Sequence, residues 1–280
     1  MAMSIVTNVG SLNAQRNLSK TGGALQKSLA QLSSGLRINR ASDDAAGLAI
    51  SENLKAQIRS LGQAERNAND GISLLQTAEG AMNEVQGIMG RMRELAVQAS
   101  SDTVSDTERG YAQQEFSALM SEVDRIANVT EYNGTTLLDG SATGIEFQVG
   151  INDTANDRIS VDIADMRTSA LGTGGGGSAL STLDISTKAG AQAALDVVDA
   201  AIEDVSSGRA DIGAVENRLQ ITTSNLASAR ENLSAANSRI RDADVASATA
   251  DLTRNTILQQ AGVSVLAQAN QAPQLALSLL

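Results

Sequence analysis

The stretch VDAAIEDVSSGRADIGAVENRLQITTSNLASARENLSAANSRI, residues 198–240, decides the fold of this chain. Its positions in a seven-residue register are all apolar: Val198, Val205, Ile212, Leu219, Leu226, Leu233 and Ile240. The column three residues further on, from Ala201 to Ala236, holds only small or aliphatic side chains. This register indicates a long helix with a narrow seam, as in coiled-coil packing. At roughly 1.5 Å per residue such a helix is about 65 Å long, so we expect an elongated protein.

A second register of the same kind precedes it. Its positions are Leu54, Leu61, Ala68, Leu75, Met82, Met89 and Ala96, with a companion column from Gln57 to Ala99. Downstream, Ser105-Asp-Thr-Glu108 has the spacing of a capping box and predicts the start of a third helix. The chain is therefore predicted to contain helices over 43–100, 105–130 and 187–240, with Ser186 or Thr187 capping the last.

The middle of the chain has a different pattern. Residues 145–149 and 158–163 alternate apolar and polar side chains, which predicts a β-hairpin. The loop 152–157 is rich in Asn and Asp but lacks the glycine and closing glutamate of a calcium loop, so we interpret it as an ordinary turn. Residues 174–177 are all glycine and predict a flexible crossing. The predicted fold class is mainly α, a long coiled-coil-like helical bundle with a small β-hairpin region at about 140–180.

The two ends of the chain form amphipathic arms. The apolar positions of the arms are Ile5, Val9, Leu12, Leu18, Leu25, Leu29 and Leu32 at the start, and Val245, Leu252, Leu266, Leu277 and Leu280 at the end. Ser34-Gly35 should stop the first arm, and Ser42 should cap the next helix, with Asp43 and Asp44 in its first turn.

Each arm is too thin to form a core alone. We therefore expect the arms to pair with each other and with copies in other subunits, and unclosed contacts of that kind build helical filaments. The alternative is an antiparallel pair within a monomer.

Composition excludes several classes of chemistry. The chain contains no histidine and no cysteine, which rules out Ser-His-Asp and Cys-His nucleophiles and the usual zinc sites. We predict no catalytic residue, no metal and no cofactor. The aromatic residues are confined to one third of the chain, as Tyr111, Phe116, Tyr132 and Phe147.

Charge is unevenly distributed. Residues 1–42 carry five cations and no acid, so with a net charge of −11 the remainder carries −16. An acidic body argues against nucleic acid as a partner. The last 26 residues are uncharged, but glutamines and asparagines interrupt every apolar run, so we predict no membrane insertion. The start, MAMSIVTNVGS, lacks the pattern of a cleavable signal peptide.

Several long motifs resemble bacterial flagellin. LSSGLRINRASDDAAGLAI (32–50) resembles the N-terminal signature of that family. The family's order continues with RMRELAVQAS from Arg91, EVDRIANVTEYNGTTLLDG from Glu122, NRLQITTSNLASARENLSAANSRIRDADVA from Asn217 and LAQANQAPQLALSLL from Leu266. The resemblance covers roughly 1–140 and 185–280.

The resemblance implies a filament subunit for swimming motility. Residues 1–42 and 243–280 would form an inner coiled-coil domain, and 43–242 a rod-like shell domain without large outer domains. It also implies an extracellular filament, export without a cleavable signal, and an export chaperone, a filament cap and junction proteins as partners. By matching motif positions, Arg91, Leu95 and Glu115 would contact the vertebrate Toll-like flagellin receptor; alternatively they serve packing or solvation.

Three rival interpretations remain at the level of sequence. A hook–filament junction protein has flagellin-like ends, and purified copies of it would not grow long filaments. An enzyme would need a carboxylate pair such as Glu146 and Asp162 on the hairpin. A membrane-active secreted helical protein would explain the uncharged tail.

Overall fold

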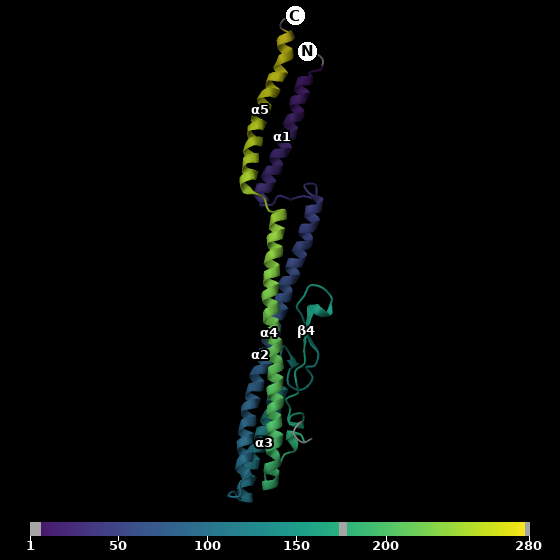
Figure 1. Ribbon diagram of the computed structural model, residues 1–280. Coiled ribbons are helices and arrows are strands. Elements are labelled where there is room, and N and C mark those ends of the chain that lie inside the picture. Colours follow the sequence, from purple (N-terminus) through teal and green to yellow (C-terminus); the bar gives the residue numbers. More distant parts are fainter. Residues whose placement is uncertain (1–6, 174–177, 278–280) are drawn as a thin grey trace. The chain divides into compact units, whose positions relative to one another are not determined.

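The computed structural model describes residues 7–173 and 178–277. The described helices are α1 (Val9–Ser34), α2 (Ala45–Ala99), α3 (Asp106–Val129), α4 (Lys188–Arg241) and α5 (Val245–Leu277) (Figure 1). The strands are β1 (Glu131–Tyr132), β2 (Thr135–Thr136), β3 (Ile145–Gln148) and β4 (Arg158–Val161). The 3-10 turn η1 (Ala155–Asp157) lies between β3 and β4, and η3 (Leu180–Thr182) lies between β4 and α4. The mainly α fold class is confirmed.

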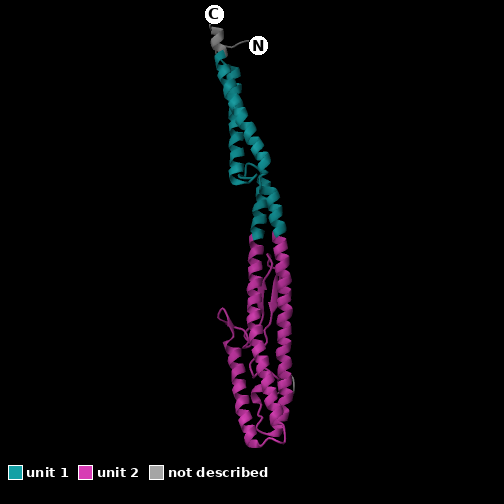
Figure 2. Cartoon of the chain, turned by 90° about the vertical axis from the view of Figure 1, so that its left-hand side faces the viewer, with its two compact units in different colours: residues 1–58, 231–280 teal, residues 59–230 magenta. Residues whose placement is uncertain are grey.

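The chain divides into two compact units, coloured separately in Figure 2. Unit 1 comprises residues 1–58 and 231–280, and unit 2 comprises residues 59–230. The poly-glycine stretch 174–177 lies outside the described residues.

Unit 2 is held together by the two predicted seams. Leu61, Ala68, Leu75, Met82, Met89 and Ala96 of α2 are buried, as are Val198, Val205, Ile212, Leu219 and Leu226 of α4. Phe116 and Val123 of α3 join the same hydrophobic cluster. Narrow apolar stripes on three helices therefore meet in one core, which is the usual solution for long helices with few aromatic residues.

Two antiparallel hairpins complete unit 2. Strands β1 and β2 flank Asn133-Gly134, and both turn residues have positive φ, of 51° and 78°. Tight two-residue hairpins require such values, which Asn and Gly tolerate best. Strands β3 and β4 pair from Ile145 with Val161 to Gln148 with Arg158, somewhat shorter than the sequence predicted. Phe147 of this hairpin packs on α2 at Gly71, where a Cβ would lie 2.9 Å from the ring.

In unit 1, α1 and α5 lie side by side (Figure 1), which confirms that the terminal helices pair. Helix α1 ends at Gly35, whose φ is 70°, as expected for a glycine stop. The Arg37 amide donates to the Arg241 carbonyl at 2.6 Å, and its guanidinium donates to the Ile240 carbonyl. These bonds satisfy carbonyls at the end of α4 and tie together the segments that lead into the two arms.

The predicted cap of α2 was assigned to the wrong residue. Helix α2 begins at Ala45, and the Asp44 carboxylate, rather than Ser42, accepts the amide of Gly47 at 2.8 Å. The two other predicted caps hold. Ser105 and Glu108 form a complete capping box at the start of α3, and the Thr187 hydroxyl accepts the Gly190 amide at the start of α4.

Candidate assembly surface

The arms contain two distinct sets of apolar side chains. The first set lies along the seam between α1 and α5 and is half-buried there: Leu18, Leu25, Leu32, Leu252 and Leu266. Leu18 points at Gly262, because a Cβ added to that glycine would lie 3.2 Å from its Cδ1. These predicted arm residues hold α1 and α5 to each other.

The second set stays exposed although α1 and α5 have paired. Val9, Leu12 and Leu29 of α1 and Val245, Ile257, Leu258, Val263 and Val265 of α5 are each 49–64% exposed. The sequence reasoning found the first four of these residues and missed the last four, because they fall outside the heptad column of α5. Ile5 and Leu280, and the side chain of Leu277, lie outside the described residues.

Polar groups interrupt the seam itself. Ser28 is buried and accepts a hydrogen bond from the Asn255 amide at 3.4 Å, and the Ser11 hydroxyl donates to Asn270 at 2.6 Å. The seam also contains glycine and alanine at Gly262 and Ala269. Such a seam buries little apolar area, so pairing of the two arms is only modestly stabilised by the hydrophobic effect.

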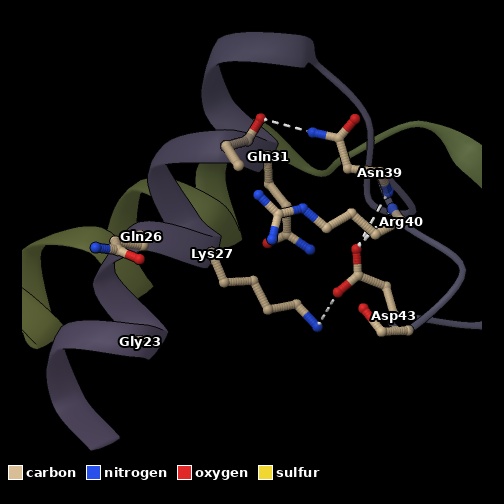
Figure 3. Close-up of a pocket in the computed structure, with 9 residues that line it drawn as sticks. Gly23, Gln26, Lys27, Gln31, Asn39, Arg40 and Asp43 are labelled. Atoms are coloured by element: carbon tan, nitrogen blue, oxygen red, sulfur yellow. Dashed lines mark hydrogen bonds and ion pairs between the residues drawn. The ribbon is translucent and has the colours of Figure 1, made fainter. Parts of the chain in front are cut away.

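The loop between α1 and α2 is fixed onto α1 by a polar pocket (Figure 3). The Lys27 ammonium lies 2.9 Å from the Asp43 carboxylate, which also accepts the amides of Asn39 and Arg40. The Lys27 hydrogen bond, helped by the two amides, lowers the pKa of Asp43. On the same side, the Gln31 amide donates to the Arg37 carbonyl at 2.8 Å. These contacts therefore fix the orientation of the loop against α1.

The predicted receptor residues do not share one surface. Arg91 and Glu115 form an exposed ion pair with a 2.8 Å nitrogen–oxygen distance, joining α2 to α3. Arg91 also pairs with Glu94, and hydrogen bonds to Glu94 and Glu115 raise the pKa of Arg91. Leu95, in contrast, is only 2% exposed and belongs to the core of unit 2. Leu95 lies on the same face of α2 as the buried residues Met92 and Ala99, three residues before it and four after it, so its side chain points into the core.

Glu146 and Asp162, the carboxylate pair considered from the sequence, do not act as a pair in the structure. Glu146 pairs with Arg158 at 3.7 Å, whereas Asp162 accepts the Gly144 amide at 2.6 Å, so these two carboxylates serve different partners. In the loop 152–157, Asp153 binds Arg158 and Asp157 accepts the Thr154 hydroxyl. Across residues 7–173 and 178–277, no three acidic side chains gather as they would to hold a metal ion. In the same part of the chain, no helix is long and apolar enough to cross a membrane.

Comparison with family models shows two matches. The bacterial flagellin N-terminal helical region matches residues 5–143, and the bacterial flagellin C-terminal helical region matches residues 195–280. A flagellin of Halalkalibacterium halodurans is 48% identical over 278 residues, which cover 99% of this chain and 100% of that protein. A flagellin of Bacillus subtilis is also 48% identical, over 305 residues, with 99% and 100% covered. A flagellar filament 33 kDa core protein of Treponema phagedenis is 43% identical over 288 residues, with the same coverage.

Solved structures agree on the fold. The crystal structure of Bacillus cereus flagellin matches with a TM-score of 0.50 and 32% identity, covering 57% of this chain and 88% of that one. A putative flagellar hook-associated protein from Vibrio parahaemolyticus matches with a TM-score of 0.60 at 15% identity, covering 71% and 100%. The second likeness concerns the fold alone.

Proposed function

Because this chain belongs to the bacterial flagellin family, we propose that its subunits join through the exposed apolar faces of α1 and α5. As a flagellin, the chain is a structural subunit that polymerises with copies of itself into the flagellar filament, an extracellular structure that serves motility.

The observation that carries the proposal is the outward-facing apolar set of the arms. Eight valine, leucine and isoleucine side chains remain about half exposed after α1 and α5 have paired. Burying the exposed half of such a side chain is favourable by roughly 1 kcal/mol. The seam between α1 and α5 is thin and partly polar, whereas the exterior of the pair is apolar. Packing against further copies would therefore bury apolar surface that pairing alone leaves in water.

Point substitutions on α5 test the proposal. We expect Val263→Ser combined with Val265→Ser to raise the concentration needed for filament growth at least tenfold, because both side chains lose their apolar contacts with neighbouring copies. Sedimentation of polymer and electron microscopy measure the change. Gln268→Ser, at an exposed polar position of the same helix, is the matched control and should assemble normally. Normal growth of the double variant would show that the contacts lie elsewhere.

We propose functional boundaries that follow the ends of the helices. Residues 1–42 and 243–280 would form the inner domain, and 43–242 the shell domain. The breaks in helical structure between Ser34 and Ala45 and between Arg241 and Val245 support this division. The compact units divide at 58/59 and 230/231 instead, because α2 and α4 continue past these breaks.

We also propose the partners that the family resemblance implies. An export chaperone would cover the apolar face of α5 before assembly, since exposed Ile257 and Leu258 need shielding from other copies. Cap and junction proteins would meet the same faces at the ends of a filament. The role is proposed to be structural only, without catalysis, metal or cofactor.

The proposed contact with a vertebrate Toll-like receptor rests on Arg91 and Glu115, since both are exposed and lie next to each other. Leu95 would contribute by packing in the core below them. Arg91→Ala is expected to reduce receptor signalling by the monomer at least tenfold without loss of helix content. Arg125→Ala, which removes an exposed Arg–Glu pair from α3, serves as control.

A further inference from the structure

The one proline of the chain, Pro273, lies inside α5. In an α-helix the amide of each residue donates to the carbonyl four residues earlier, and proline has no amide hydrogen. The carbonyl of Ala269 therefore has no amide at position 273 to bind. This carbonyl, which lacks its helical hydrogen bond, distinguishes one position of α5 from the others, whose backbone hydrogen bonds repeat along the helix.

Asn8 of the other arm donates to this carbonyl. Its Nδ2 lies 2.7 Å from the Ala269 oxygen. The same side chain caps α1, because its Oδ1 accepts the Ser11 amide at 2.9 Å. One amide group thus uses its acceptor to start α1 and its donor to satisfy the carbonyl that Pro273 leaves open.

We infer that Asn8 and Pro273 together set the register in which α1 and α5 pair. The pairing is antiparallel, since Asn8 meets Ala269 whereas Ser28 meets Asn255. A slide by one heptad would preserve the seam columns, so hydrophobic burial alone discriminates poorly between registers. Polar contacts at defined positions supply that discrimination in other coiled coils.

Each direction of sliding meets a specific obstacle. In one direction Asn8 would face the carbonyl of Gly262, which already has the amide of Leu266 as its helical partner. In the other direction Leu18 would face Ala269 instead of Gly262. A Cβ on Gly262 would lie 3.2 Å from Leu18 Cδ1, which is a tight contact, so Leu18 would have to shift to accommodate the Cβ of Ala269.

The consequence for assembly rests on the proposed function. The register fixes where Val9, Leu12 and Leu29 of α1 stand relative to Ile257 and Val263 of α5. These are the side chains proposed to contact other copies, so a shifted pair would present a different surface. Asn8 is thus a positioning residue for assembly.

Engineered disulfides can read the register directly, because the natural chain has no cysteine. The variant Ser11→Cys with Asn270→Cys reports the native register, since the two natural side chains lie 2.6 Å apart. Ser11→Cys with Val263→Cys reports a slide by one heptad. The full-length chain is oxidised at a concentration below assembly, and intramolecular cross-links are quantified on non-reducing gels and by mass spectrometry.

The register is then challenged with Asn8→Asp and Pro273→Ala. Aspartate keeps the cap of α1 but cannot donate to Ala269. We expect Asn8→Asp to lower the ratio of native to slid cross-links about fivefold. Pro273→Ala restores an amide at 273 and should lower the ratio similarly, and Asn8→Asp should then add little in that background.

Three results would overturn the inference. One is a ratio of native to slid cross-links that Asn8→Asp leaves unchanged. The absence of both cross-links in the parent chain would also overturn the inference, because the native register would then not be populated. The third is an equal effect of Asn8→Asp with proline and with alanine at 273, which would mean that Asn8 does not act through the open carbonyl. Filament growth is scored separately, so failure of the proposed assembly surface would leave the cross-link ratios interpretable.

Discussion

Glycines in α2 have opposite energetic roles at different positions. A Cβ at Gly71 would lie 2.9 Å from the Phe147 ring, so only glycine lets the β3–β4 hairpin approach the helix. A Cβ at Gly87 or Gly90 would meet nothing within 4 Å, and nothing in the structure explains these two glycines. An unneeded glycine inside a helix lowers stability because it has more backbone freedom in the unfolded chain.

Substitutions by alanine should therefore change stability in opposite directions. Gly87→Ala is expected to raise the free energy of unfolding by about 1 kcal/mol. Gly71→Ala should lower it by about 1–3 kcal/mol through overpacking against Phe147. Urea unfolding followed by circular dichroism measures both values. Equal effects of the two substitutions would contradict this account.

Asp139 provides a test of pH dependence. Its carboxylate accepts the hydroxyls of Ser141 and Thr136 at 2.5 and 2.7 Å and the Ser141 amide at 3.0 Å. These bonds, led by the Ser141 hydroxyl, lower the pKa of Asp139 to about 2. Because the folded-state pKa is depressed, the associated stability is complete above pH 3.8 and is lost as the pH falls toward 2.

We expect a carboxyl titration of Asp139 by NMR to have its midpoint near 2 in the native chain. Thr136→Val combined with Ser141→Ala removes the two hydroxyl donors and should move the midpoint toward the usual value for aspartate. The other carboxylates of the chain serve as internal references in the same spectra. An unchanged midpoint in the double variant would assign the shift to another cause.

The ends of the helices depend on individual side chains of neighbouring elements. The buried Arg109 guanidinium of α3 donates to the carbonyls of Ala99 and Ser101, at 2.7 and 2.8 Å, where α2 ends. Its Nη1 donates to Asp106 at 2.6 Å. One cation therefore satisfies carbonyls at the end of α2 and fixes the turn into α3.

Removing this cation should be costly. Arg109→Met is expected to lower the free energy of unfolding by about 2–3 kcal/mol, because buried carbonyls lose their donors. Arg125→Met on the same helix removes an exposed pair with Glu122 and should change stability by less than about 0.5 kcal/mol. Parallel denaturant titrations compare the two variants. A small loss for Arg109→Met would mean that water replaces its hydrogen bonds.

The sequence allowed the helices and the two long seams to be predicted, because apolar residues in seven-residue register have few alternatives. The cap of α2 was missed because Ser42, Asp43 and Asp44 are all acceptable caps, and Asp43 is drawn to Lys27 by a contact that the sequence does not reveal. The outward face of α5 was missed for a related reason. Its seam includes Asn255 and Gly262, so the largest apolar residues lie outside the expected column.

The main hydrophobic cluster of the described residues is confined to one unit. Among the described residues, every member of the main cluster lies between Ala68 and Leu219, inside unit 2. The arms add a seam and an exposed apolar face but contribute nothing to that cluster. Folding of unit 2 and assembly through the arms should therefore be separable.

Trimming the chain to 43–242 tests this separation. The trimmed chain keeps the entire main cluster, so its helices should melt within a few degrees of those of unit 2 in the full chain. Under precipitating salt, electron microscopy should show long tubes from the full chain and only monomers from the trimmed one. Tubes from both would place the assembly contacts within 43–242.

The placement of the aromatic residues has a consequence for spectroscopy. Tyr111 is 67% exposed on α3 and Tyr132 is half-buried in β1, and the chain has no tryptophan. Both natural fluorophores thus belong to unit 2, and intrinsic emission does not report on the arms. A single tryptophan introduced at Leu258, which is 49% exposed on the apolar face of α5, would be the only indole in the protein. Its emission would follow the burial of α5 during polymerisation in real time, against a background of tyrosine alone.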